Sequence, residues 1–188
     1  MKRAPAILLA FLAAGQACAG AEKRLADWPD RYDEHFRKNA KHYFGPGMDW
    51  RWFKAQGIAE SGLKPGAKNK TGARGIMQIL PRTFEEIQED NPHMKDIDSP
   101  RWNIAAGIYY DYVLYNRWKS PPPGEERLFF TFGSYNAGYS KIRKYFKQAR
   151  PKTASWEEVE HAVPGQTRHY VRRIRRLMNT AAVDSGKK

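Results

Sequence analysis

Glu60 is the side chain in this sequence best placed to donate a proton. It falls two residues before Gly62, a natural helix terminator, and the apolar residues before it recur on one helical face: Trp52, Ala55 and Ala59. The negative end of a helix dipole raises the pKa of a carboxyl in the last turn, and partial burial acts in the same direction. Cleavage of a glycosidic bond requires such a protonated carboxyl, because the leaving oxygen must gain a proton. A solvent-facing glutamate at a helix end is the competing interpretation, and position alone favours it.

The residues around and after Glu60 reverse that preference. They form an ordered series of motifs: Glu60-Ser61-Gly62, Ala67, Gly72-Ala73-Arg74-Gly75-Ile76-Met77-Gln78-Ile79 and Pro81-x-Thr83. Three later segments continue the series: Asn103-Ile104 with Gly107, Ser134-Tyr135-Asn136-Ala137-Gly138, and Gln166-Thr167-Arg168-His169-Tyr170-Val171. With these motifs in this order, residues 50–175 closely resemble the soluble-type (SLT) lytic transglycosylase family of the lysozyme-like superfamily.

The resemblance implies a mainly α-helical, lysozyme-like single domain of the goose-type lysozyme/SLT kind, with little or no β-structure near the active site. It also implies cleavage of peptidoglycan glycan strands between N-acetylmuramic acid and N-acetylglucosamine. Glu60 would be the single acid/base, which protonates the glycosidic oxygen and then takes the proton of the muramic C6 hydroxyl. Attack of that hydroxyl on C1 would leave a 1,6-anhydro end, and an intramolecular attack benefits from its fixed orientation.

The same resemblance implies substrate-binding residues around the acid. Gln78 and Asn136 carry amides that can hold sugar hydroxyl and acetamide groups. Tyr170 is expected to face the cleft near Glu60, and the hydroxyl of Tyr135 is expected to bond to Glu60 or to the sugar.

Three further positions complete the expected site. Met77, with Ile76, would form an apolar wall under a sugar ring, although a residue such as Met77 or Tyr135 at helical spacing is more often part of a core. Ser61 either orients the acid or helps to end the helix. Asn69 stands where many family members have serine, and it can form similar hydrogen bonds to the substrate although it is larger.

Helices must position these residues. Apolar spacing and start or stop signals predict helices before Gly45-Pro46-Gly47, from the N-cap Asp49 to Gly62, from Pro81 to about Glu89, from Ser99-Pro100, from Leu128 to Gly138, from Ser140, from Ser155 and around Tyr170–Leu177. Residues 63–80 are rich in glycine and proline and are predicted to be loop with short extended pieces. We expect a helical extension over residues 20–48, a catalytic domain over 49–182 and a disordered tail over 183–188.

Composition indicates the size of the domain and the kinds of molecule that it can bind. The chain has 188 residues and a formal net charge of +13, with 41% hydrophobic residues, which suits one compact basic domain. A basic surface attracts polyanions such as cell-wall polymers or anionic lipid headgroups. A nucleic-acid partner would fit the charge, but it does not fit the motifs around Glu60, and we expect no nucleic-acid binding.

The N-terminus reads as an export signal. Lys2 and Arg3 precede a short apolar stretch, and Ala17-Cys18-Ala19 fits a signal-peptidase site, so residues 1–19 are predicted to be removed. We therefore expect a protein of the periplasm or cell envelope. Cleavage before Cys18 would instead give an outer-membrane lipoprotein, but Gly15 is atypical three residues before such a cysteine.

No cofactor is expected, and the five histidines lack a zinc-binding spacing, so no metal site is predicted. We expect the protein to be a monomer and its partner to be the glycan strands of peptidoglycan. Two alternatives stay open: a lysozyme-type hydrolase, and a wall-remodelling component of a secretion or conjugation machine. A water-positioning carboxylate near Glu60 would favour hydrolysis, so the positions of Asp49, Glu85 and Glu86 bear on that choice.

Overall fold

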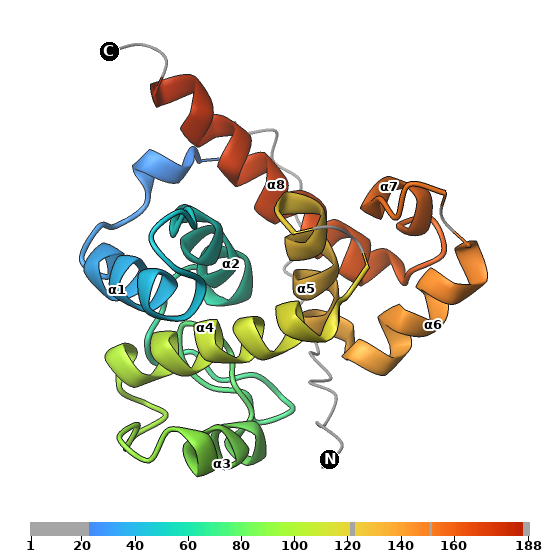
Figure 1. Cartoon of the computed structure of the whole chain (residues 1–188). Helices are drawn as coiled ribbons and strands as arrows, with labels where there is room; N and C mark the ends of the chain where they lie inside the picture. The colour runs from blue at the N-terminus through green and yellow to red at the C-terminus, as the bar shows by residue number, and fades with distance from the viewer. Residues whose placement is uncertain (1–22, 121–122, 151, 186–188) are drawn as a thin grey trace.

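The computed structural model describes residues 23–120, 123–150 and 152–185, and within them it shows a bundle of helices (Figure 1). The elements in chain order are the 3-10 helix η1 (Leu25–Asp27) and the α-helices α1 (Asp33–Phe44), α2 (Arg51–Ser61), α3 (Pro81–Asp90), α4 (Pro100–Arg117), α5 (Glu125–Ala137), α6 (Tyr139–Ala149), α7 (Trp156–Val159) and α8 (Gly165–Ser185). The expected signal peptide over residues 1–19, with Cys18, lies outside the described residues, as do residues 186–188 of the expected tail.

Helix α2 lies at the centre of this bundle. Every residue from Trp52 to Ala59 is buried, so α2 has no solvent-facing stripe along that stretch. Helices α1 and α8 pack against it. The buried Lys54 ammonium is satisfied by an ion pair of 2.7 Å with Asp33 of α1, which meets the requirement that a buried charge be paired.

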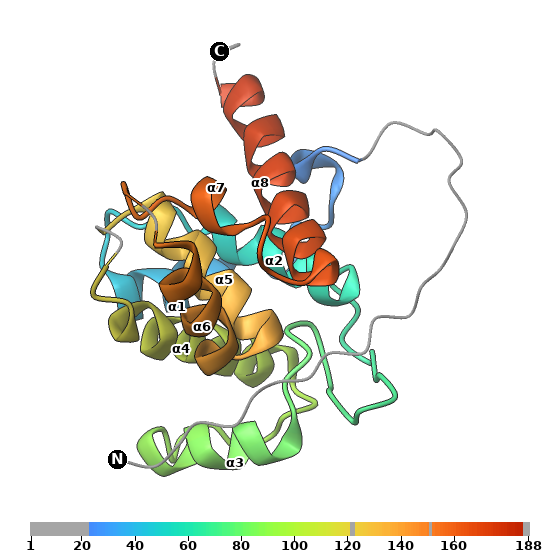
Figure 2. The same ribbon diagram turned by 90° about the vertical axis from the view of Figure 1, so that its right-hand side faces the viewer.

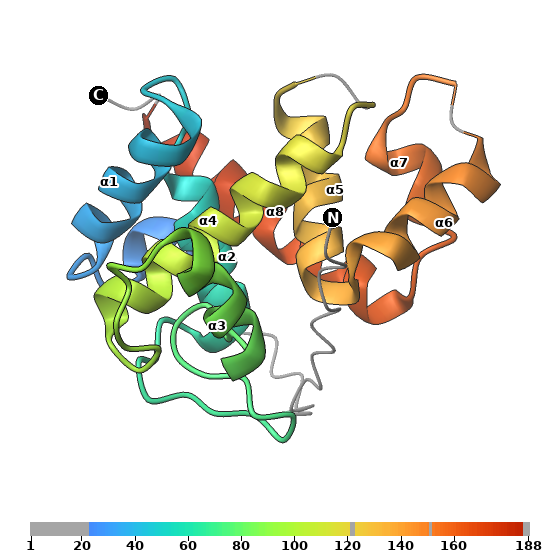
Figure 3. The ribbon, with the colours of Figure 1, turned by 60° about the horizontal axis from the view of Figure 1, so that its bottom comes forward.

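The remaining helices cover the other sides of the same core. Helix α4 packs against α1, α5 and α3, and α5 also packs against α6 and α8. Figures 1 and 3 show α1 at one end of the molecule and α6 with α7 at the opposite end. Figure 2 shows α3 below the other helices, joined to α2 by the segment 62–80. The residues Phe36 and Ala40 of α1 belong to the same core as α2.

The segment 62–80 turns the chain back beneath the end of α2. Gly62 ends α2 in the left-handed conformation (φ 64°), which glycine adopts at little cost. Two isolated bridges, Lys68 with Arg74 and Arg74 with Ile79, are the β-like pairings found there. The described part of the chain contains no β-strand, and the predicted mainly α-helical class is confirmed.

Helix α4 holds this segment in place through Asn103 and Gly107. The Asn103 side chain donates to the carbonyls of Arg74 and Ile97, at 3.0 Å each, and accepts the amide N–H of Met77 at 2.7 Å. Gly107 has no side chain, so Met77 can pack directly on the backbone of α4. Hydrogen bonds and side-chain packing therefore attach the loop to the core.

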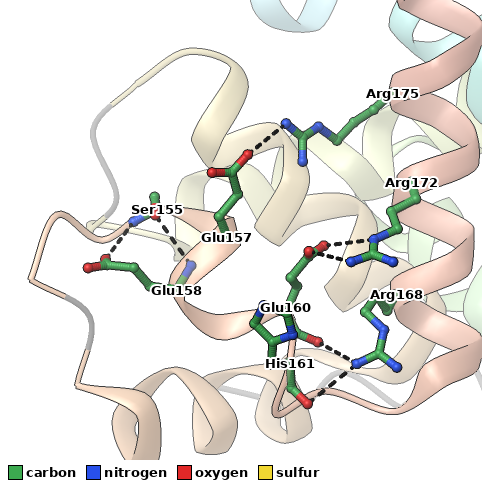
Figure 4. A network of polar contacts seen from close by, with 8 residues as sticks. All are labelled: Ser155, Glu157, Glu158, Glu160, His161, Arg168, Arg172 and Arg175. Carbon is green, nitrogen blue, oxygen red and sulfur yellow. Dashed lines mark hydrogen bonds and ion pairs between the residues drawn. The ribbon is translucent and has the colours of Figure 1, made fainter.

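Hydrogen bonds and ion pairs attach the chain after α7 to the first half of α8 (Figure 4). Glu160 Oε1 lies 2.7 Å from Arg172 Nη2, and Arg168 donates to the carbonyls of Glu160 and His161 at 3.4 Å. Burial opposes ionisation of Glu160, but the Arg172 guanidinium keeps the pKa of that carboxyl below its ordinary value. These contacts fix the part of α8 that carries Tyr170.

Most predicted helix signals are confirmed. Pro81 is the first residue of α3, Pro100 the first of α4, and Ser155 with Glu158 forms a capping box before α7. Two details differ. The N-cap of α2 is Trp50, and Asp49 instead accepts the N–H of Arg51 at 3.0 Å.

The other differences concern helix ends and one stripe. Helix α6 begins at Tyr139, one residue before the predicted Ser140, and α8 continues to Ser185, into the expected tail. The spacing of four between Ile104, Ile108 and Tyr112 predicts one apolar stripe on α4, but Tyr112 lies outside the core, with an exposed fraction of 37%. Among the described residues no helix is long and apolar enough to span a bilayer.

Replacing Gly107 by alanine is expected to lower the free energy of unfolding by about 1–3 kcal/mol, because overpacking a filled core forces side chains and backbone to shift. The added Cβ would lie 2.7 Å from both Cβ and Cγ of Met77. Urea denaturation measures the change. Gly165→Ala is the matched control, since its nearest neighbour would be Arg168 Nη2 at 3.8 Å. Equal stability of the two variants would contradict a tight contact between α4 and Met77.

Candidate active site

Glu60 occupies the last turn of α2, where α8 passes beside it. The hydroxyl of Tyr170 donates to Glu60 Oε1 across 2.5 Å, at the short end of the range for O–H···O hydrogen bonds, and Tyr170 is 2% exposed. Glu60 Oε2 is also enclosed, and it has no hydrogen-bond partner among the described residues. The residue as a whole is only partly buried. This carboxyl is therefore held at one oxygen and unsatisfied at the other.

Burial raises the pKa of Glu60 from 4.5 to about 8, and the hydrogen bond from Tyr170 opposes that rise. The direction agrees with the expectation from sequence, but the cause is chiefly desolvation, which disfavours the charged form. Burial and the neighbouring Glu60 carboxylate raise the pKa of Tyr170 well above its usual range, so Tyr170 remains a hydrogen-bond donor. A pKa raised in this way favours the protonated form of Glu60, which is the form that a general acid needs.

Ser61 does not contact the acid in this arrangement. Its hydroxyl donates to the carbonyl of Ile76 at 2.8 Å and accepts the N–H of Lys64 at 3.2 Å. Of the two expected roles, this geometry corresponds to the one at the end of the helix. Ser61 ties the end of α2 to the loop that follows it.

Asn69 and Gln78 form hydrogen bonds within the loop 62–80. Asn69 Oδ1 accepts the N–H and hydroxyl of Thr71 and the N–H of Ala73 at 2.8–2.9 Å. Gln78 is buried, and its Nε2 donates to the carbonyls of Gly75 at 2.9 Å and Ala67 at 3.2 Å. Both side chains shape the backbone near Glu60. Their contact with substrate stays a prediction.

Met77 and Tyr135 are both fully buried, at 0% exposure. The Tyr135 hydroxyl donates to the Met77 carbonyl at 2.7 Å. Of the two bonds expected of Tyr135, the one to Glu60 is not formed here, because the hydroxyl donates to the loop carbonyl of Met77. The bond to the sugar stays a prediction. The apolar wall expected of Met77 is likewise covered in this structure, since its side chain packs on Gly107.

Asn136 is 4% exposed, and its Oδ1 accepts the hydroxyl of Thr167 at 2.8 Å. Its Nδ2 is enclosed and has no partner among the described residues. This bond links the end of α5 to the start of α8. Asn136 therefore keeps an unsatisfied donor, which suits its predicted role toward an acetamide or hydroxyl oxygen.

Asp111 of α4 is a buried acid that was not predicted. It is 0% exposed, and Gln56 Nε2 donates to its Oδ1 at 3.2 Å. Burial raises the pKa of Asp111 well above its usual range, and the charge of Glu60 acts in the same direction. The signal was available: Asp111 continues the buried series of Ile104 and Ile108 at a spacing of four and then three.

The three acids considered for water positioning have other surroundings. Asp49 forms an ion pair of 2.7 Å with Arg51 at the opposite end of α2, roughly 15 Å along the helix axis from Glu60. Glu85 is exposed, and Glu86 pairs with Arg82 at 3.4 Å. Residues 23–120, 123–150 and 152–185 contain no group of three His, Cys, Asp or Glu side chains that could hold a metal ion.

Comparison with solved structures identifies the fold. The chain is similar to the 70-kDa soluble lytic transglycosylase SLT70 of Escherichia coli, with a TM-score of 0.64 and 23% identity over 79% of this chain and 23% of that one. It is also similar to lytic transglycosylase Slt of Pseudomonas aeruginosa, solved as an inactive glutamate-to-glutamine mutant, with a TM-score of 0.66 and 21% identity over 79% and 23% of the two chains. The predicted lysozyme-like fold of the SLT type is confirmed.

Sequence comparison finds further proteins named lytic transglycosylases. Membrane-bound lytic murein transglycosylase F of Shewanella loihica is 30% identical over 77% of this chain and 34% of its own length. The protein of that name from Pectobacterium atrosepticum is 27% identical over 68% and 26%. The chain thus spans about a quarter to a third of the length of these relatives. The family model described as the Transglycosylase SLT domain matches residues 36–157, a span that contains Glu60 and its loop. The chain therefore belongs to the transglycosylase SLT domain family.

Proposed function

We propose that this protein is a lytic transglycosylase that cleaves the bond between N-acetylmuramic acid and N-acetylglucosamine in peptidoglycan and leaves 1,6-anhydro ends. The observation that carries the proposal is the Glu60 carboxyl, which is enclosed at the end of α2 and hydrogen-bonded to Tyr170. Family membership supplies the substrate class, because relatives over this domain are named lytic murein transglycosylases.

Glu60 first acts as the acid. Its proton passes to the glycosidic oxygen while the bond from that oxygen to C1 of the muramic sugar breaks. The resulting carboxylate is stabilised by the hydrogen bond from Tyr170, which is shorter than most neutral bonds. The carboxylate then takes the proton of the C6 hydroxyl as that oxygen forms its bond to C1. Glu60 ends protonated, and no water is consumed.

The surroundings of the other acids support this route over hydrolysis. A hydrolase that inverts configuration needs a second carboxylate with room for a water molecule. The carboxyl that interacts electrostatically with Glu60 is Asp111, and Asp111 is fully buried and bonded to Gln56. Such a group has no free surface on which to position a water molecule.

The cellular setting is part of the same proposal. We infer action in the periplasm or cell envelope on peptidoglycan strands, in keeping with the relatives named membrane-bound and with the expected export signal. The formal net charge of +13, which becomes +11 when Lys2 and Arg3 are removed with residues 1–19, suits an anionic wall. The chain is proposed to act as a monomer, in wall turnover or beside a secretion or conjugation machine.

Glu60→Gln should abolish cleavage while the fold persists, because an amide keeps the shape of the carboxyl but cannot donate the proton. Activity is expected to fall at least 100-fold, within the range that general acid catalysis contributes (about 10²–10⁴-fold). Mass spectrometry of muropeptides released from purified peptidoglycan measures both rate and product. Products about 18 Da lighter than hydrolysed ones, one water less, are expected from the wild type. Reducing muramic ends would make the enzyme a hydrolase, and an active Glu60→Gln variant would remove Glu60 from the mechanism.

Activity should fall as pH rises through about 8, because the acid form of Glu60 is then lost. The same raised pKa predicts a trend in stability. The folded state binds the Glu60 proton more tightly than the unfolded chain, so this contribution is full below pH 4.5 and is lost as pH rises through about 8. Thermal unfolding at pH 5 and pH 9 should therefore show a larger loss for wild type than for Glu60→Gln. Equal losses would contradict the raised pKa.

Tyr170→Phe should raise the pKa of Glu60 further, since the tyrosine hydrogen bond lowers it. The alkaline limb of the pH–rate profile is expected to move to higher pH. The turnover rate is expected to fall about 10–100-fold, as for loss of a hydrogen bond to a charged group worth about 1.5–3 kcal/mol. Tyr109→Phe is the matched control, because it removes a tyrosine bond of 2.7 Å to Asp90 at the surface. The hypothesis fails if both variants leave the profile unchanged.

A further inference from the structure

Gln56 and Asp111 form a buried polar contact one helical turn before Glu60. Gln56 precedes Glu60 by four residues, so the two side chains share one face of α2. Asp111 approaches from α4. Gln56 and Asp111 are both 0% exposed, and Gln56 Nε2 lies 3.2 Å from Asp111 Oδ1. A polar pair with no access to water must satisfy its own hydrogen bonds.

The Gln56 Nε2 group is the one donor of this contact, and two oxygens of the pair are left without a hydrogen bond. Gln56 Oε1 and Asp111 Oδ2 are both enclosed, and neither has a hydrogen-bond partner among the described residues. Both atoms are acceptors when Asp111 is ionised, so they cannot satisfy each other. A proton on Asp111 Oδ2 turns that atom into a donor, and Gln56 Oε1 is an acceptor that lacks a donor.

We propose that Asp111 is a protonated carboxylic acid that forms two hydrogen bonds with Gln56, and that this neutral acid–amide pair is a positioning element for Glu60. One bond runs from Gln56 Nε2 to Asp111 Oδ1, and the other from Asp111 Oδ2 to Gln56 Oε1. The pair joins α2 to α4 directly behind the acid. Its role in catalysis rests on the proposed function, whereas the protonation of Asp111 does not.

The groups around Asp111 favour the neutral form. The titratable side chains that interact with it are Glu60 of α2, Tyr110 of α4, Tyr135 of α5 and Tyr170 of α8, and none of these carries a positive charge. A carboxylate buried without a cation is very costly, and such a group takes up a proton instead. Burial accordingly raises the pKa of Asp111 well above its usual range.

A neutral Asp111 matters for the Glu60 proton cycle. Glu60 must become a carboxylate after it has protonated the leaving oxygen. An ionised Asp111 nearby would disfavour that carboxylate, since like charges in a buried site raise the pKa of each other. The amide of Gln56 holds Asp111 without bringing a charge of its own. The pair thus fixes the end of α2 and leaves the charge of Glu60 free to change.

Infrared spectroscopy tests the protonation directly. Glu60 and Asp111 are the two described carboxyls whose pKa is raised, whereas the pKa of the buried Glu160 is lowered. The Glu60→Gln variant removes the first of them, so at pH 7 the carboxylic-acid C=O band that remains should belong to Asp111. This band is expected in Glu60→Gln and should disappear in the double variant Glu60→Gln/Asp111→Asn. Identical spectra in this region would overturn the proposal. This measurement needs no activity, so it separates failure of the pair from failure of the proposed function.

Activity of the single variants tests the positioning role. Asp111→Asn keeps the shape and can donate to Gln56 Oε1, so its alkaline limb should stay at the wild-type pH. Asp111→Leu leaves the Gln56 amide unsatisfied and should lose at least tenfold in rate, which Asp111→Asn rescues. An alkaline limb that moves to lower pH in Asp111→Asn would show that a negative charge had been removed, and would overturn the neutral pair. If Asp111→Leu does not fold, the limb of Asp111→Asn and the infrared band decide the matter.

Discussion

The hydrogen bond between Tyr170 and Glu60 joins residues 110 positions apart, and much of the structure serves to bring them together. A carboxyl enclosed at the end of α2 needs a donor, and Tyr170 reaches it only because α8 packs along α2. The contacts of Arg168 and Arg172 with the chain after α7 hold that half of α8 in place (Figure 4). The free energy of packing thus supports an acid whose own burial is unfavourable.

The loop after Glu60 explains why so many polar side chains are conspicuous in the motifs and yet buried. Ser61, Tyr135 and Asn103 bond to the backbone of Ile76 and Met77 from three different helices. Gln78 and Asn69 close further bonds within the loop itself. Each of these bonds satisfies a polar group that would be costly if left alone in the interior. Together these bonds fix the backbone of the loop next to Glu60.

Buried charge is handled in three different ways within a few turns of α2. Lys54 is neutralised by an ion pair with Asp33. Glu60 accepts a hydrogen bond from Tyr170, which lowers the pKa that burial raises. Asp111 contacts an uncharged amide. The ion pair and the amide contact secure α2 against α1 and α4, whereas the tyrosine bond is the one that the proposed chemistry uses.

The sequence by itself determined the features that depend on neighbouring residues. Gly62, Pro81 and the Ser155–Glu158 capping box set helix ends, because backbone conformation and capping act within one turn. The motif series around Glu60 indicated the family. Only the tertiary structure decided which partner each polar group meets. It gave the Tyr135 hydroxyl to Met77 and buried Asp111, and it showed that Tyr170, which was expected near Glu60, donates a hydrogen bond to that carboxyl. These outcomes depend on how α2, α4, α5 and α8 pack. Residue spacing along one helix does not predict which other helix will pack against it.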